Sequence, residues 1–261
     1  MTLMLTLLCR DEADILESML RFHLDQGVEL IIATDNGSVD GSLTLLQRYE
    51  RMGKLRLIQE PDHSHDQAVW VTRMARMAAD LGADWVINSD ADEFWWPAQG
   101  NLASTLAELP ATVEAVTVER TNFLPPPRNT NDQRPFHQRQ VLRERLSRNS
   151  LGKPLPPKLI HRAYPNVTVS DGNHGATLNG ESLAAISNSG IEILHVPIRS
   201  SNERFAKAPR PSNATAAWGQ EWATAGATCT TPTSKPALCR LTTTASALMT
   251  QRSPPNWPAA S

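Results

Sequence analysis

The sequence predicts an α/β domain built on a mostly parallel β-sheet with right-handed crossovers. Short apolar runs alternate with helical patterns over residues 1–121, and this order places helices against a parallel sheet. The chain has 261 residues, of which 40% are hydrophobic, so it can bury a sizeable core. No apolar run reaches the roughly 18 residues that a membrane-spanning helix requires. These three observations favour one globular domain with no membrane span.

Each element follows from its own pattern, in chain order. Residues 3–9 form a continuous apolar run, typical of a strand covered on both faces. A helix is predicted over residues 11–26, where Ile15, Met19 and Phe22 recur at helical spacing and Gly27 marks the end. The alternation then repeats, which predicts strands at residues 30–34, 55–59 and 85–88, a helix that Asp40 caps, and a helix over residues 66–81.

Polar clusters follow the first, second and fourth of these strands. They are Arg10-Asp11-Glu12, Asp35-Asn36 and Asp90-Ala91-Asp92-Glu93. Ligands of open α/β sheets bind outside the carboxyl ends of the strands, so we expect the three clusters to converge on one site. The alternative is that each cluster consists of cap and turn residues, a common use of Asp and Asn. For Asp40 we prefer that interpretation.

Asp90 and Asp92 are two carboxylates placed two residues apart at the end of an apolar strand. Both can reach one divalent cation, and such hard oxygen ligands suit Mg²⁺ or Mn²⁺. An ion held there can bridge to a diphosphate and neutralise its charge as it leaves. A D-x-D pattern is common by chance, but its position after the fourth strand predicts a metal and diphosphate site.

The chain changes character after residue 121. Eight of its 19 prolines lie in residues 122–165, which predicts a loop-rich insertion rather than a second core. The basic residues of this segment, Lys158 among them, either face an acidic ligand or form a solvated surface. Short strands return at residues 167–169 and 191–196. Residues 209–261 contain no Ile, Val, Phe, Tyr or Asp, so we expect a disordered tail, either of natural low complexity or from a shifted reading frame.

Five motifs in order resemble those of family 2-type glycosyltransferases and the related family 92-like group. They are L-L-C-R-D-E-A-D at 7–14, D-N-G-S-V-D-G-S at 35–42, I-N-S-D-A-D-E-F-W at 87–95, D-G-N-H-G at 171–175 and L-H-V-P-I-R-S at 194–200. The resemblance covers about residues 1–208. It implies a GT-A fold, a Rossmann-like sheet flanked by helices, with a nucleotide-binding half at 1–121 and a loop-rich acceptor half at 122–208.

The resemblance also implies roles for single residues, with a nucleotide-sugar as donor and UDP as its nucleotide. Arg10 and Glu12 would line the nucleotide pocket, Asp35 would contact the base or ribose, Arg73 would face the nucleotide or its phosphates, and Asp90 would contact the ribose or the ion. Asp92 would be the main metal ligand, and His195 would be a third ligand that suits Mn²⁺ better than Mg²⁺. Asp171 and Glu93 are the candidate bases for the acceptor hydroxyl.

Some of these roles have structural alternatives. Arg73 could instead pair with Asp66 or Asp80 on its helix, and His195 could be a structural residue. The resemblance predicts a metal-dependent glycosyltransferase that moves a sugar to a glycan or lipid-linked acceptor, in glycan or cell-surface polysaccharide synthesis. The alternative is a truncated or inactive homologue that binds the sugar nucleotide without turnover. A D-x-D phosphotransferase is a weaker alternative, since its nucleophilic Asp would lie near the N-terminus.

The composition limits which binding partners and which cellular compartment we expect. The net charge of −2 argues against a nucleic-acid binder that uses a large basic surface. Three scattered cysteines do not make a disulfide framework, and the apolar start of the chain lacks a basic leader. We therefore expect a reduced, cytoplasmic protein that binds no nucleic acid, with peripheral membrane contact left open.

Overall fold

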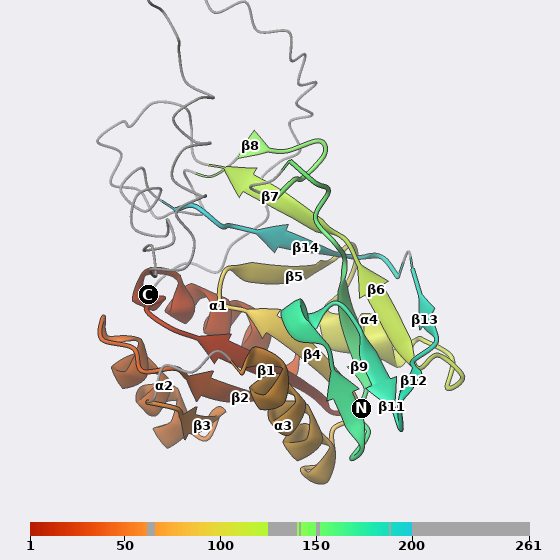
Figure 1. Ribbon diagram of the computed structural model, residues 1–261, viewed down its shortest axis with the longest axis horizontal. Coiled ribbons are helices and arrows are strands. Elements are labelled where there is room, and N and C mark those ends of the chain that lie inside the picture. Colours follow the sequence, from red (N-terminus) through yellow and green to blue (C-terminus); the bar gives the residue numbers. More distant parts are fainter. Residues whose placement is uncertain (62–65, 125–139, 141, 150–151, 188, 200–261) are drawn as a thin grey trace, which may run out of the picture.

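A central sheet organises the computed structural model, which describes residues 1–61, 66–124, 140, 142–149, 152–187 and 189–199. The tail predicted at residues 209–261 lies outside the described residues. Within them, the sheet has seven strands (Figure 1). Their spatial order is β13 (Ala185–Ile186), β6 (Ala115–Val118), β9 (Lys158–Arg162), β4 (Trp85–Asp90), β1 (Leu3–Cys9), β2 (Val28–Asp35) and β3 (Leu55–Gln59).

The sheet is mostly parallel, as the alternation of strands and helices predicts. β1 pairs in parallel with β2 and β4, and β2 pairs in parallel with β3. β9 is the exception, because it runs antiparallel between β4 and β6. β9 comes from residues 122–165, and its Ile160 is fully buried. The segment expected to be a loop-rich insertion therefore contributes one strand, β9, to the central sheet.

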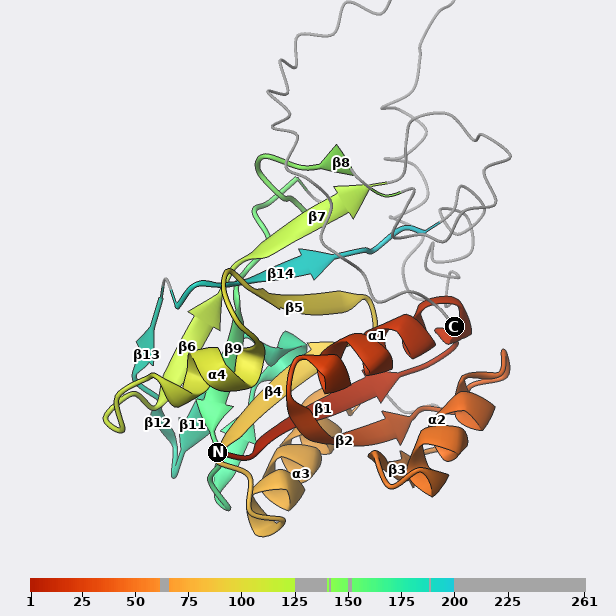
Figure 2. The same ribbon diagram turned by 180° about the vertical axis from the view of Figure 1, so that it is seen from behind.

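Helices cover both faces of the sheet, and the alternation of side chains along β1 explains how. Leu3, Leu5 and Leu7 point to the face that carries α1 (Ala13–Asp25), α2 (Ser42–Arg51) and α4 (Leu102–Ala107). Met4 points to the other face, which α3 (Gln67–Asp80) covers. Figures 1 and 2 show α1 and α3 on opposite sides of the sheet. This layering is the α/β class that the sequence predicts.

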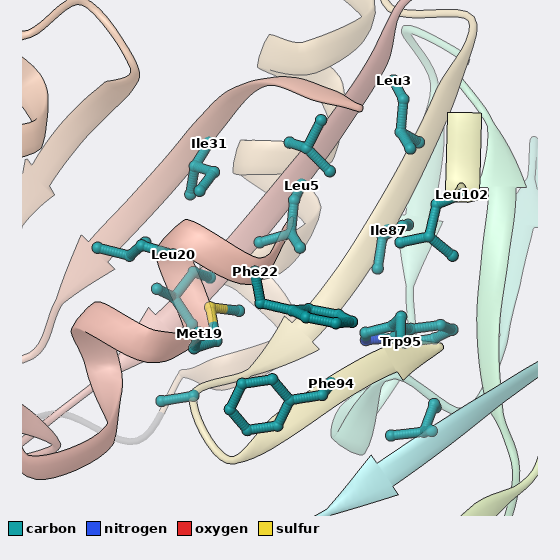
Figure 3. Close-up of a cluster of buried hydrophobic side chains, with 14 of the residues drawn as sticks. Leu3, Leu5, Met19, Leu20, Phe22, Ile31, Ile87, Phe94, Trp95 and Leu102 are labelled. Atoms are coloured by element: carbon teal, nitrogen blue, oxygen red, sulfur yellow. The ribbon is translucent and has the colours of Figure 1, made fainter. Parts of the chain in front are cut away.

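A second sheet extends the core beyond the end of β4. Its order is β5 (Glu93–Pro97), β14 (Ile191–His195), β7 (Arg120–Leu124) and β8 (Leu142–Arg143). Phe94 and Trp95 of β5 are fully buried, and the Phe94 ring meets the Phe22 ring of α1 edge to face at 5.4 Å (Figure 3). β5 follows β4 after only two residues, so the D-x-D segment is held between two buried strands.

The two predicted halves share both larger sheets. β9 lies beside β4, and β14 pairs with β5, so strands from either side of residue 121 are neighbours. The remaining described elements are β10 (Val167–Val169), β11 (Ala176–Leu178) and β12 (Glu181–Ser182), which form a small sheet, and the 3₁₀ turn η1 (Asp171–Asn173). No helix in the described part of the chain is long and apolar enough to cross a membrane.

Candidate functional site

The polar clusters that follow β1, β2 and β4 lie at one edge of the central sheet. In the parallel register, Cys9 at the end of β1 pairs with Asp35, and the preceding Leu8 pairs with Asp90. The three strand ends are therefore neighbours at one edge of the sheet, while their role as one ligand site stays a prediction.

Hydrogen bonds between the first two loops fix this edge. Asp11 accepts a hydrogen bond from the Val39 N–H at 2.7 Å, and its own N–H donates to the Ser38 hydroxyl at 3.1 Å. Asp40 accepts from the Ser42 N–H at the start of α2 and from the Ala13 N–H at the start of α1, both at 2.9 Å. Asp40 thus contacts the starts of two helices, although Gly41 and not Asp40 occupies the N-cap position of α2.

Asp35 and Arg73 carry buried polar atoms that lack partners among the described residues. Asp35 is 2% exposed; its Oδ2 accepts the Ser38 N–H at 3.1 Å, but its Oδ1 has no hydrogen bond. Arg73 Nη1 pairs with Glu60 at 2.7 Å rather than with Asp66 or Asp80, while Nε and Nη2 are unpaired. The Glu60 N–H donates to the Asp35 carbonyl, which brings the two residues into one region. Unpaired buried groups are costly, so this region suits a ligand that both donates and accepts.

A buried lysine joins the carboxylates of the D-x-D-E motif. Lys158, at the start of β9, is 1% exposed, and its Nζ lies 2.5 Å from Asp90 Oδ2 and 2.9 Å from Glu93 Oε1. Burial alone would lower the pKa of Lys158, but the charges of Glu93 and Asp90 outweigh it and raise that pKa. The side chain is therefore an ammonium. Arg120 Nη1 adds a second cation 3.5 Å from Glu93 Oε1.

Asp92 faces His195, and the surroundings of His195 fix which ring nitrogen carries the proton. His195 Nδ1 lies 2.7 Å from Asn122 Oδ1. The Asn122 amide nitrogen donates to Glu144 Oε2 and to the Arg148 carbonyl, so Asn122 Oδ1 must be the atom that accepts from His195. In the neutral ring, Nε2 is therefore the nitrogen without a proton, and it lies 3.6 Å from Asp92 Oδ2.

This arrangement fits a divalent ion, but with two protein ligands rather than three. A ligating histidine typically donates its other N–H to an oxygen, as His195 does to Asn122. Among the residues that the structure describes, no group of three or more His, Cys, Asp or Glu could hold a metal. Asp90 is engaged by Lys158 instead. Ions such as Mg²⁺ are often held by one or two carboxylates together with substrate phosphates. The predicted set of Asp90, Asp92 and His195 stays a prediction, of which the structure brings the last two together.

The remaining predicted residues lie around this centre. Asp171 is exposed at the start of η1, and Asn173 of the same turn approaches Asp90 Oδ1 at 3.4 Å, which explains how the D-G-N-H segment reaches the motif. Glu93 is fully buried, so an acceptor could reach it only if neighbouring side chains moved. Arg10 is exposed and lies 3.7 Å from Asp11. The choice of base between Asp171 and Glu93 stays a prediction.

One known protein family matches most of this chain. The model of glycosyltransferase family 92 matches residues 9–174, which is more than half of the chain and extends from the end of β1 through η1. The chain belongs to glycosyltransferase family 92. A comparison with curated proteins found no match.

Two solved structures are among those to which the chain is similar. S. aureus TarS 1-349 in complex with UDP-GlcNAc is 13% identical, with a TM-score of 0.48, over 81% of this chain and 62% of that one. Glucosyl-3-phosphoglycerate synthase from Mycobacterium tuberculosis, in complex with Mn²⁺, UDP and phosphoglyceric acid, is 18% identical, with a TM-score of 0.30, over 46% and 43%. The family 92 chain spans less than two thirds of the length of either protein.

Sequence reasoning gave no role to Arg199, which ties the first loop of the family 92 domain to the segment after β14. Arg199 is 3% exposed, and its Nη2 lies 2.6 Å from Glu12 Oε2, while Nε lies 2.5 Å from Asp14 Oδ2. Glu12 is thus held by an ion pair at the margin of the expected nucleotide pocket. The only sequence signal for Arg199 is its place in the motif at 194–200.

Replacement of Arg199 by Met should destabilise the protein by about 2–3 kcal/mol, because Glu12 and Asp14 both lose a buried cationic partner. Asp14 is nearly half exposed and can turn to water instead, whereas Glu12 is mostly buried. Urea unfolding measures this. The control is Arg48→Met, which removes an exposed pair with Glu17 and should change stability little. Equal losses of stability in the two variants would show that the buried ion pairs of Arg199 contribute no more than an exposed pair.

Proposed function

We propose that this family 92 protein transfers a sugar from a UDP-sugar to a hydroxyl group of a glycan or lipid-linked acceptor. The observation that carries the proposal is the pairing of two features at one sheet edge. Asp35 and Arg73 hold unpaired buried hydrogen-bonding atoms, and Asp92 and His195 face each other with a carboxylate oxygen and a ring nitrogen. The first feature suits a base, and the second suits a diphosphate with its ion.

The donor would be recognised by complementary hydrogen bonds. Asp35 Oδ1 is an acceptor that can take the ring N–H of uracil, and the unpaired nitrogens of Arg73 are donors for a base carbonyl or a phosphate oxygen. Arg10, exposed after β1, can meet the diphosphate. The contacts of Asp35 and Arg73 satisfy atoms that otherwise lack a partner among the described residues, so nucleotide binding should stabilise the folded protein.

The chemistry would be a displacement at the anomeric carbon. The bond from this carbon to the diphosphate oxygen breaks, and a bond to the acceptor oxygen forms. The acceptor proton passes to a base, for which Asp171 and Glu93 are the candidates. When bound beside Asp92 and His195, Mn²⁺ or Mg²⁺ would neutralise the charge of the departing nucleoside diphosphate.

Thermal unfolding with nucleotides tests the base pocket. UDP should raise the melting temperature of the wild type more than GDP or ADP does, since a ligand of the folded state stabilises it according to its occupancy. The shift should vanish in Asp35→Leu and persist in the control Asp25→Leu, which alters an exposed carboxylate at the end of α1. An equal UDP shift in Asp35→Leu would refute the proposed base contact.

Release of UDP from a UDP-sugar in the presence of Mn²⁺ then separates turnover from binding. Binding without any release would select the inactive homologue. The cytoplasmic location expected from the cysteine content stays a prediction.

A further inference from the structure

Lys158 reaches the acidic motif because β9 is antiparallel to β4. The start of an antiparallel strand lies at the carboxyl end of its neighbour, so Lys158 arrives at the edge where Asp90 ends β4. Val118 pairs with Lys158 on the other side, which keeps the stem of the lysine inside the sheet. The position of the ammonium is therefore set by the central sheet and not by a surface loop.

The ammonium also contacts two carboxylates of the motif. Its Nζ contacts Asp90 Oδ2 at 2.5 Å and Glu93 Oε1 at 2.9 Å, and the side chain is 1% exposed. Glu93 in turn accepts the Asp90 N–H at 3.2 Å, so lysine, glutamate and aspartate form one closed unit. Without this cation the two carboxylates would repel each other, and the charge of the fully buried Glu93 would be costly.

We propose that Lys158 is a built-in counter-ion that assembles the D-x-D-E motif without metal and keeps Asp90 and Glu93 away from the ion. Asp92 and His195 are then the only side chains of this cluster that face a divalent ion, in agreement with the lack of a three-ligand group among the described residues. This inference rests on the proposed function only in taking the same edge as the diphosphate site. Lys158 is a positioning residue in this scheme.

A counter-ion of this kind affects metal affinity, whereas a purely structural lysine would not. Metal affinity rises with the number of charged oxygen ligands. Removing the ammonium leaves Asp90 without its cation, whereas Glu93 keeps Arg120 at 3.5 Å. Asp90 then becomes available as a further ligand, so Lys158→Met should bind Mn²⁺ more tightly than the wild type even though it is less stable.

The test is Mn²⁺ binding to nucleotide-free protein, measured by electron paramagnetic resonance. We expect Lys158→Met to bind Mn²⁺ about tenfold or more tightly than the wild type, whereas Lys158→Arg, which keeps the charge, should match the wild type. The control is Lys153→Met, which removes an exposed lysine from the segment before β9. An unchanged or weaker Mn²⁺ affinity in folded Lys158→Met would overturn the proposal.

Stability gives a second measurement. In EDTA, Lys158→Met should melt about 10 °C below the wild type, and Mn²⁺ should restore part of this loss while shifting the wild type less. If Lys158→Met does not fold, the double variant Lys158→Met/Glu93→Gln replaces it, because it removes one carboxylate together with the cation. This double variant should still bind Mn²⁺ more tightly than the wild type. A Mn²⁺ affinity no higher than that of the wild type overturns the proposal. Neither readout uses nucleotide or sugar, so this inference and the proposed sugar transfer can fail separately.

Discussion

Replacement of Asp92 by Ala is expected to lower the rate of sugar transfer about a thousandfold while leaving the fold intact. Asp92 is one of the two side chains that would hold the ion, and its Oδ2 lies 3.6 Å from His195 Nε2. The backbone contact of Asp92 does not depend on its side chain, because the Asp92 carbonyl accepts the Val196 N–H at 2.8 Å. Initial rates of UDP release across a range of Mn²⁺ concentrations measure the effect.

The loss should lie mainly in kcat, since the ion acts most strongly on the charge that develops as the diphosphate leaves. Asp25→Ala, which changes an exposed carboxylate on α1, should keep the wild-type rate. If Asp92→Ala keeps more than about a tenth of the wild-type rate at saturating Mn²⁺, the loss of rate is much smaller than removal of such a contact typically causes. Asp92 would then not be the metal ligand.

The first half of the fold could be predicted because its signals are local. β1 and β3 begin and end at the predicted residues 3–9 and 55–59, since each is a short segment rich in aliphatic residues between polar turns. β5 was not predicted as a strand, because it starts with the acidic Glu93, which continues the D-x-D cluster in the sequence. Burial of Glu93 depends on Lys158, and no local pattern reveals such a partner.

The same limit applies to the site. Asp35, Asp90 and Asp92 could be placed at one edge, because strand order and the position after each strand determine it. Their partners come from far along the chain: Lys158 lies 68 residues after Asp90, and Arg199 lies 187 residues after Glu12. Antiparallel insertion of β9 brings Lys158 to the motif, and residue spacing does not encode that step. The sequence thus predicts which carboxylates gather, and tertiary packing decides which of them a lysine or arginine neutralises.

Two buried histidines should make the protein labile in acid. Burial lowers the pKa of His23 and of His161 to about 4 in the folded state, against about 6.5 in the unfolded chain. Between these values the unfolded chain binds protons that the folded protein does not, so stability is complete above pH 6.5 and falls as the pH drops toward 4. His23 must stay neutral, because its Nε2 accepts the Trp95 N–H at 3.3 Å in the core.

At pH 4.5 each histidine should cost about 2.5 kcal/mol of unfolding free energy relative to pH 7. His161→Leu isolates one of them, because His161 Nε2 is buried without a partner among the described residues and the aliphatic side chain suits the core on the face of the sheet that Leu159 shares. Urea unfolding of the wild type and His161→Leu should therefore give curves whose stability difference shifts by about 2.5 kcal/mol in favour of the variant between pH 7 and pH 4.5. The carboxylates titrate in both proteins and cancel in this difference. A difference that does not change with pH would mean that His161 takes up its proton without loss of the folded state.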